Sequence, residues 1–236
     1  DTQFEQRGAA VWGDPNQDQE MDVTSVIADF QGRSIEDITW LLSARFDKNS
    51  DFDDIVTGRA SIAWDVSVET TLSANIGTGQ KAPTFIERYG YFPGQFAGNP
   101  DLKPEQSESY DIGIQQRIAS SASIQIAVFR QTVEDEIDGF VFDPETSLFT
   151  AKNLDTTSKR SGVEVGARGA VSEHLDLSMN YTYTNSTDNG STELRRPRHA
   201  GNATMDANFL EGRARLTLVA DYGGTRQDIY FPPWPE

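Results

Sequence analysis

The sequence predicts an all-β fold, an antiparallel transmembrane β-barrel meander, and three observations support this. Segments in which apolar and polar residues alternate with period two recur along the whole 236-residue chain. The alternating segments are about ten residues long, which suits a tilted strand crossing a hydrocarbon layer better than the shorter strands of globular proteins. Short and long connections take turns between them, as in outer-membrane barrels with short turns at one rim and long loops at the other.

The segment 37–47 illustrates the alternation. Ile38, Trp40 and Leu42 point to one side of the expected strand, whereas Thr39 and Ser43 point to the other. No segment carries a convincing helical period, so strands are expected throughout. The pattern predicts about ten of them, near residues 22–32, 37–47, 55–64, 69–78, 107–118, 122–133, 160–171, 174–184, 199–209 and 212–223.

The connections and the aromatic residues separate a barrel from a soluble β-sandwich, which would also alternate. Short links are expected near 33–36, 65–68, 119–121, 172–173 and 210–211, and long loops near 48–54, 79–106, 134–159 and 185–198. Aromatic side chains gather near strand ends, where barrel girdles lie. These are Trp40, Trp64 and Phe209 near the short links, and Phe46, Tyr110, Tyr183 and Tyr222 near the long loops. Strand length and loop asymmetry favour the barrel.

Composition excludes several classes of function. With 37 acidic against 20 basic side chains and a net charge of −17, the chain repels phosphate backbones, so no nucleic acid is expected to bind. The absence of cysteine removes disulfides, thiolate nucleophiles and sulfur-ligated zinc. His174 and His199 have no catalytic or zinc-binding motif around them. We therefore expect no catalytic residue, no metal and no cofactor.

Residues 77–82, GTGQKA, fit a loosened dinucleotide-binding pattern, G-x-G-x-x-A, and follow a strand-like run. Such a site needs a helix that begins at the second glycine and offers free amides to a pyrophosphate. Pro83 and the aromatic, proline-interrupted segment after it do not allow a βαβ unit. We expect the glycines to end a strand and Lys81, Ala82 and Pro83 to open a long loop.

Two charged segments have ordinary explanations that we favour. Residues 47–54, DKNSDFDD, resemble the start of a calcium loop, but Phe52 stands where such a loop needs glycine and Gly58 where it needs a bidentate acid. A solvated acidic loop is expected, and calcium binding is the alternative. RRPRH at 195–199 is expected to be an exposed strand start, and contact with lipopolysaccharide phosphates or an anionic ligand is the alternative.

Two stretches carry a family resemblance. GTGQKAPTFIERYG at 77–90 and GNPDLKPEQSESYDIGIQQ at 98–116 resemble the signature of TonB-dependent outer-membrane receptors. Gln80 departs from the aromatic residue that more often precedes the lysine. Further segments that resemble the family occur in the family's order, from about residue 22 to the end. The matching positions are Gly79, Lys81, Ala82 and Pro83 in the first stretch and Asn99, Pro100, Leu102, Lys103, Pro104 and Glu105 in the second.

The resemblance implies a fold and a function. Residues 1–236 would form a partial barrel domain, about ten of roughly 22 strands, with the plug and the final strands absent. The implied protein is no enzyme but a receptor in the outer membrane of a Gram-negative bacterium, which takes up a scarce nutrient such as a ferric siderophore or cobalamin. TonB would act through the absent plug, and outer-membrane lipid, lipopolysaccharide and the small nutrient ligand are the other implied partners.

The ligand is expected on aromatic residues of the outer loops. The candidates are Tyr89, Tyr91, Phe92, Phe96, Phe140, Phe142 and Phe149. The alternative function is a soluble β-sandwich binding module, for example for carbohydrate.

Overall fold

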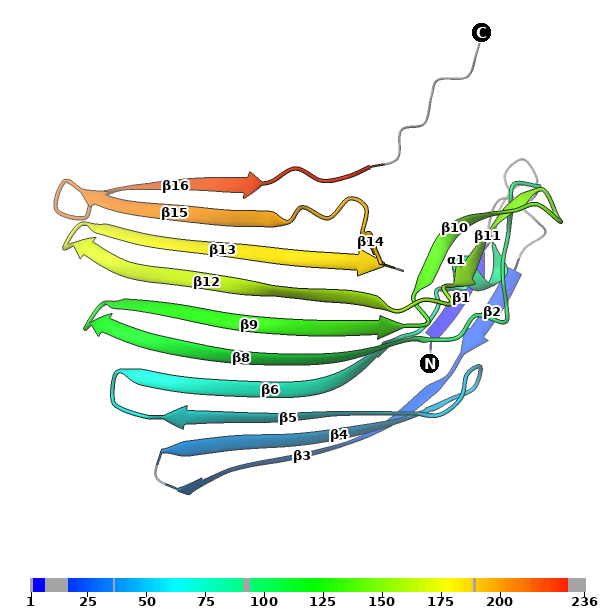
Figure 1. Cartoon of the computed structure of the whole chain (residues 1–236), viewed down its shortest axis with the longest axis horizontal. Coiled ribbons are helices and arrows are strands. Elements are labelled where there is room, and N and C mark those ends of the chain that lie inside the picture. The colour runs from blue at the N-terminus through cyan, green and yellow to red at the C-terminus, as the bar shows by residue number, and fades with distance from the viewer. Residues whose placement is uncertain (1, 7–16, 36, 91–93, 189, 229–236) are drawn as a thin grey trace, which may run out of the picture.

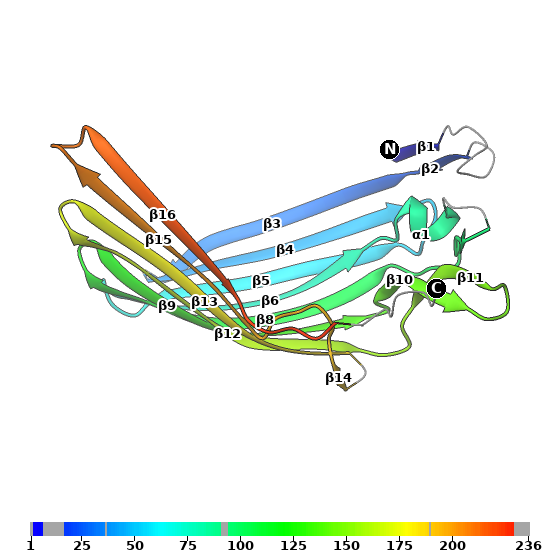
Figure 2. The ribbon, with the colours of Figure 1, turned by 90° about the horizontal axis from the view of Figure 1, so that it is seen from above.

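Ten long strands form one curved antiparallel sheet in the computed structural model, which describes residues 2–6, 17–35, 37–90, 94–188 and 190–228 (Figure 1). Strands that follow one another along the chain are neighbours in the sheet, so the predicted meander is confirmed. Figure 2 shows the sheet bent into an open trough. The strands are β3 (Val23–Ile35), β4 (Ile38–Asn49), β5 (Ile55–Asp65), β6 (Thr70–Lys81), β8 (Glu105–Ala119), β9 (Ala122–Glu134), β12 (Ser158–Ser172), β13 (Leu175–Asp188), β15 (His199–Phe209) and β16 (Ala214–Gly223).

One face of the sheet is apolar and uncovered. Trp40, Ile62, Ala74, Ile112 and Val128 are successive partners across five strands and form one apolar row. Ile112 is 64% exposed, although burying such a side chain is worth about 1.5–3 kcal/mol. Within the described residues the ten strands make a single sheet with no second sheet stacked on it. The soluble sandwich is therefore wrong, and a lipid-facing surface explains the exposed apolar rows.

The opposite face is polar, as the alternation predicts. Arg59 donates to the Asn75 side chain over 3.4 Å, and the Asn75 amide donates to the Asp111 carboxylate over 2.7 Å, so polar side chains bridge three strands. Asn180 donates to Asn202 over 3.1 Å in the same manner. A face that satisfies its polar groups laterally can line a wet barrel interior. No helix among the described residues is long and apolar enough to span a membrane.

The two ends of the sheet differ, as predicted. The turns that join β3 to β4, β5 to β6, β8 to β9, β12 to β13 and β15 to β16 are short and lie at one end, here called the short-turn rim (Figure 1). The long connections lie at the other end, the long-loop rim. Three of the long connections contain further elements that the sequence pattern did not predict: α1 (Phe85–Tyr89) and β7 (Phe96–Ala97) in one, β10 (Ile137–Asp143) and β11 (Leu148–Asn153) in the next, and β14 (Ser191–Thr192) in the last. A β1 (Thr2–Gln6) and β2 (Gln17–Met21) hairpin precedes the sheet, and β14 pairs with β13.

Helix α1 corrects the expectation that the chain has no helix. Thr84 is its N-cap: the Glu87 amide donates to the Thr84 hydroxyl over 3.2 Å, and the Thr84 amide donates to the Glu87 carboxylate over 2.7 Å. This reciprocal capping box stabilises a helix start. A helix of five residues is too short to show a helical period, which explains why the pattern did not predict it.

Backbone contact holds α1 against the segment that follows it. The Asn99 amide donates to the Glu87 carbonyl over 2.9 Å, and a Cβ added to Gly98 would lie 2.4 Å from the Arg88 carbonyl oxygen. Gly90, at φ +72°, ends the helix in a conformation that favours glycine. The absence of a side chain at Gly98 is what allows this approach.

Gly98→Ala is expected to push α1 away from this segment, at a cost of about 1–3 kcal/mol, because the methyl group would overlap backbone atoms that cannot rotate aside. Hydrogen–deuterium exchange of residues 85–104 in the detergent-purified full-length protein measures the effect. Gly223→Ala is the matched control, since a Cβ there meets nothing within 4 Å. Equal exchange in the two variants would contradict the close-approach argument.

Candidate functional site

The long-loop rim carries a second, smaller sheet. In this loop sheet, β11 pairs antiparallel with β10 and parallel with β7, where Phe149 lies opposite Phe96 (Figure 1). Its core is a cluster of buried apolar side chains, to which Phe149 adds a partly buried ring. The cluster consists of Phe96, Leu102, Ile137 and Ala151. The loops at this rim therefore form a folded unit rather than separate connections.

Four phenylalanines of the loop sheet form a continuous stack, here called the phenylalanine ladder. The Phe140 ring centroid lies 6.2 Å from that of Phe96 and 4.2 Å from that of Phe149, both in stacked geometry. Phe142 meets Phe149 edge-on at 5.6 Å. Phe140 is 65% exposed and Phe142 52% exposed. The ladder offers solvent a flat apolar surface on a rigid base, a suitable seat for a ligand with an apolar or planar face.

The structure thus brings together four of the seven predicted ligand-binding residues. Tyr89 lies in another group: its ring stacks on Phe85 at 6.2 Å and lies 5.0 Å from the Arg88 guanidinium carbon. Tyr91 and Phe92 lie outside the described residues.

Arg88 is a residue of this rim that the sequence pattern did not single out. It is 7% exposed, its Nη1 lies 3.1 Å from the Asp51 carboxylate, and its guanidinium covers the Phe52 ring at 4.7 Å. A hydrogen bond from Ser50 lowers the pKa of Asp51, burial opposes this, and Arg88 lowers the pKa further. Arg88 therefore ties α1 to the loop between β4 and β5. No local pattern marks this pair, because its members are 37 positions apart.

The family-signature residues hold the loop sheet rather than face solvent as a group. The Asn99 side chain donates to the Ala151 carbonyl over 3.0 Å. Asn153 of β11 accepts from the Lys103 amide over 2.8 Å and donates to the Lys103 carbonyl over 2.9 Å. Leu102 is 3% exposed and belongs to the loop-sheet core. This segment is therefore held against β11, the central strand of the loop sheet.

The first part of the signature closes the same junction. Lys81, the last residue of β6, forms a 2.8 Å ion pair with Glu105, the first residue of β8. Glu105 also accepts from the Ile137 amide over 3.1 Å, which connects the junction to β10. The remaining signature residues are Gly79 inside β6, buried Pro83, exposed Ala82 and Pro100, and half-buried Pro104.

Gln80, the departure from the family pattern, fills a polar position. Its amide donates to the Asp47 carboxylate over 3.0 Å, and Asp47, 2% exposed, also accepts from Ser25 at 2.5 Å and from Arg45 at 2.8 Å. An aromatic ring here would leave this buried carboxylate one donor short. Gln80 Oε1 is buried and has no hydrogen-bond partner among the described residues.

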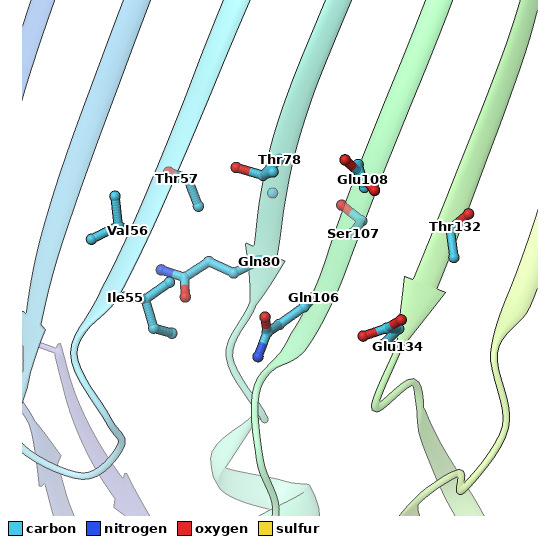
Figure 3. A pocket seen from close by; sticks show the side chains of 11 residues that line it. Ile55, Val56, Thr57, Thr78, Gln80, Gln106, Ser107, Glu108, Thr132 and Glu134 are labelled. Atoms are coloured by element: carbon cyan, nitrogen blue, oxygen red, sulfur yellow. The ribbon is translucent and has the colours of Figure 1, made fainter.

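A cavity of about 250 Å³ lies where β5 and β6 separate, on the long-loop side of their last paired residues, Arg59 and Gly77 (Figure 3). Gln80 reaches from β6 toward β5, and Gln106, Glu108 and Glu134 come from the next two strands. Most residues that line the cavity are polar, and its volume is below that of a usual small-molecule site, so it suits water.

In the segment 47–54, the carboxylates of Asp47, Asp51 and Asp54 make protein contacts. Asp47 is engaged by Arg45 and Asp51 by Arg88, and the residues that the structure describes contain no group of three or more acidic or histidine side chains able to hold a metal. The calcium alternative therefore receives no support from the geometry. Gly77 and Gly79 lie inside β6, and α1 begins only at Phe85, so GTGQKA has no helix for a pyrophosphate.

The basic cluster at 195–199 is largely paired with acids. Arg195 lies 2.8 Å from Asp228, and Arg196 lies 3.0 Å from Glu193. These pairs favour the structural explanation of the cluster over contact with an anionic ligand. His199, at the start of β15, has its Nδ1 2.6 Å from the Tyr181 hydroxyl.

Glu193 is the centre of a half-buried ion network that links this cluster to the loop sheet. Arg160 lies 3.0 Å from Glu193 and 2.8 Å from Glu136, and Ser186 donates to Glu193. Burial raises the pKa of Glu193, but the hydrogen bonds from Arg160, Ser186 and Arg196 outweigh it and lower the pKa to about 2. The carboxylate therefore stays charged and fixes the connection between β13 and β15.

Comparisons with known proteins agree with this architecture. The chain is 30% identical over 193 residues to the vitamin B12 transporter BtuB of Photobacterium profundum and 32% identical over 207 residues to that of Vibrio vulnificus. Each alignment covers 79% of this chain, but only 30% and 31% of the relatives, so the chain spans about a third of their length.

Solved structures share the fold. The siderophore receptor PirA from Pseudomonas aeruginosa superposes with a TM-score of 0.73 at 19% identity, over 90% of this chain and 40% of the receptor. The alcaligin outer-membrane receptor FauA from Bordetella pertussis superposes with a TM-score of 0.65 at 14% identity, over 91% of this chain and 39% of the receptor.

One protein family matches almost the whole chain. The TonB dependent receptor-like, beta-barrel family matches residues 4–234, which include the signature stretches and all ten strands of the large sheet. The chain therefore belongs to the TonB-dependent receptor β-barrel family.

Proposed function

We propose that this chain is part of a receptor that takes up a scarce nutrient, such as a ferric siderophore or cobalamin, in a TonB-dependent manner. The observation that carries the proposal is the phenylalanine ladder, an exposed apolar surface on a folded loop sheet at the long-loop rim of a membrane barrel. Family members are outer-membrane proteins of Gram-negative bacteria, and this chain has that location. The relatives named as vitamin B12 transporters and siderophore receptors indicate the nutrient classes.

In this proposal the chain binds and guides a ligand and makes or breaks no bond. The ladder residues Phe96, Phe140, Phe142 and Phe149, together with Tyr89, Tyr91 and Phe92, form part of the outer binding surface. TonB acts on a plug inside the closed barrel, and the polar face of the sheet lines the path that opens.

We also propose that residues 1–236 form one barrel segment that is completed by further strands. Edge strands β3 and β16 each have one partner among the described residues. An edge with unpaired amides and carbonyls cannot remain in lipid, because no water satisfies it there. Outer-membrane lipid and lipopolysaccharide would cover the apolar face of the closed barrel.

Deleting the gene that encodes the full-length protein is expected to abolish growth on one limiting nutrient, either cobalamin or siderophore-bound iron. Complementation with the intact gene should restore growth only in a strain that has TonB. The measurement is uptake of radiolabelled nutrient in matched strains with and without TonB. Unchanged uptake of every tested nutrient would contradict the proposed function.

A further inference from the structure

Four arginines at the long-loop rim have acidic partners. The ion pairs join Arg88 to Asp51, Arg160 to Glu136 and Glu193, Arg195 to Asp228, and Arg196 to Glu193, at 2.8–3.1 Å. Their charges are compensated inside the protein. Arg88 and Arg160, whose side chains are largely buried, are therefore poor anchors for an anionic ligand, because each would have to leave a partner first.

Most acids beside the phenylalanine ladder have no such partner. Residues 135–157 contain six acidic residues, of which Glu136 pairs with Arg160, and one basic residue, Lys152. Lys152 lies opposite Asp138 in the β10–β11 register, yet within the described part of the chain no ion pair reaches Asp138, Asp143 or Glu145. The hairpin that carries Phe140, Phe142 and Phe149 therefore has an excess of negative charge.

Two of these carboxylates are fixed next to the ladder by local hydrogen bonds. Asp138 accepts from the Phe140 amide over 3.1 Å. Asp143, which follows Phe142, accepts from the Glu145 amide over 3.0 Å and from the Thr146 hydroxyl over 2.7 Å. The hydrogen bond from Thr146 lowers the pKa of Asp143, so this group stays charged at neutral pH. The negative charges are therefore a stable property of the hairpin.

We propose that the nutrient that docks on the phenylalanine ladder is neutral or cationic and presents a flat apolar face, and that polyanionic ligands are excluded. This inference rests on the proposed function and narrows its ligand class. An apolar face gains contact with Phe140 and Phe142 at no electrostatic cost, and a cationic ligand gains attraction as well. A ferric tricatecholate, which is a trianion, meets repulsion from carboxylates that lie within about one Debye length of the rings.

The test measures equilibrium binding to the full-length receptor in detergent with three probes of different charge. These are cyanocobalamin, which is neutral, a cationic ferric trihydroxamate and a trianionic ferric tricatecholate. The neutral or the cationic probe is expected to bind at least about tenfold more tightly than the tricatecholate. Tighter binding of the tricatecholate than of both other probes would overturn the inference.

Two sets of variants identify the groups responsible. Phe140→Ala combined with Phe142→Ala is expected to weaken binding of the preferred probe about tenfold or more, because both rings are exposed contact groups. Phe30→Ala is the control, since Phe30 is 64% exposed on the apolar face of β3 and far along the chain from the loop sheet. Its binding should equal that of the unmodified receptor.

The second set tests charge. Asp138→Asn, Asp143→Asn and Glu145→Gln together keep the turn acceptors but remove three charges. This variant is expected to improve tricatecholate binding about tenfold and to leave cyanocobalamin binding within about twofold. Asp37→Asn, at the short-turn rim, is the control and should change neither value. Unchanged tricatecholate affinity in the triple variant also overturns the inference.

The same probes separate this inference from the proposed function. A receptor that binds and transports the tricatecholate best retains the proposed function and refutes the charge preference. A receptor that neither binds nor transports any of the three probes counts against both.

Discussion

Asn153→Ala is expected to release the loop sheet from the barrel rim while the barrel itself stays assembled. The Asn153 side chain makes three hydrogen bonds to backbone groups: from the Lys103 amide at 2.8 Å, to the Lys103 carbonyl at 2.9 Å and to the Asp135 carbonyl at 2.7 Å. Each lost bond costs about 1 kcal/mol net, and more where the backbone group cannot reach water. The loop sheet should therefore lose about 3 kcal/mol of local stability.

Hydrogen–deuterium exchange of residues 96–104 and 137–153 in the detergent-purified full-length protein measures this release. Asn153→Asp sharpens the interpretation, because a carboxylate can still accept from the Lys103 amide but cannot donate to either carbonyl. Residues 96–104 and 137–153 of Asn153→Asp should exchange nearly as fast as those of Asn153→Ala. Asn180→Ala, which removes one hydrogen bond on the polar face of the barrel, is the control. If these residues exchange equally fast in Asn153→Ala and in Asn180→Ala, the Asn153 side chain does not hold the loop sheet against the barrel rim.

This clamp gives the family signature a physical meaning. Lys103 sits between Leu102, which enters the loop-sheet core, and Pro104, which leads into β8. The motif therefore joins the loop sheet to a membrane strand at a fixed position. The ligand surface that we propose belongs to other residues, the ladder of β7, β10 and β11. A motif can thus identify the family without including the proposed ligand site.

The large sheet was predictable because period-two alternation is a local property of the chain. The segments predicted at 107–118 and 122–133 are β8, Glu105–Ala119, and β9, Ala122–Glu134. In each, a one-residue slip would turn isoleucines from the apolar to the polar face, so the pattern fixes the register as well as the strand. The short turns then predict that consecutive strands are antiparallel neighbours in the sheet.

The loop sheet was not predictable in the same way. The sequence identified Phe96, Phe140, Phe142 and Phe149 as candidate contacts, but Phe96 meets Phe149 through a parallel pairing of strands about fifty residues apart. Nothing local encodes such a pairing. A signal for the hairpin does exist, since Asp143 and Pro144 form a typical turn dipeptide between two short apolar runs.

The second large expected effect is a loss of local stability around Glu193 at low pH. The folded-state pKa of Glu193 is lowered from 4.5 to about 2, so its ion network stabilises the fold above pH 4.5 and loses that contribution as the pH falls toward 2. The difference corresponds to about 3 kcal/mol, and the carboxylate is only 19% exposed, so solvent screens it little. We expect the connection between β13 and β15 to loosen in acid before the barrel does.

The amide of Glu193, which donates to the Ser186 carbonyl over 3.1 Å, reports this loosening. Its exchange protection, corrected for the intrinsic rate at each pH, should stay constant from about pH 7 to 5 and fall about tenfold or more by pH 3. Glu193→Gln should show weaker protection at neutral pH and little further change in acid, because the titrating group is gone while Arg160 keeps only Glu136. Glu211→Gln, at the short turn between β15 and β16, should behave like the unmodified protein. If the protection of this amide falls equally with pH in the unmodified protein and in Glu193→Gln, a group other than the Glu193 carboxylate controls this loop.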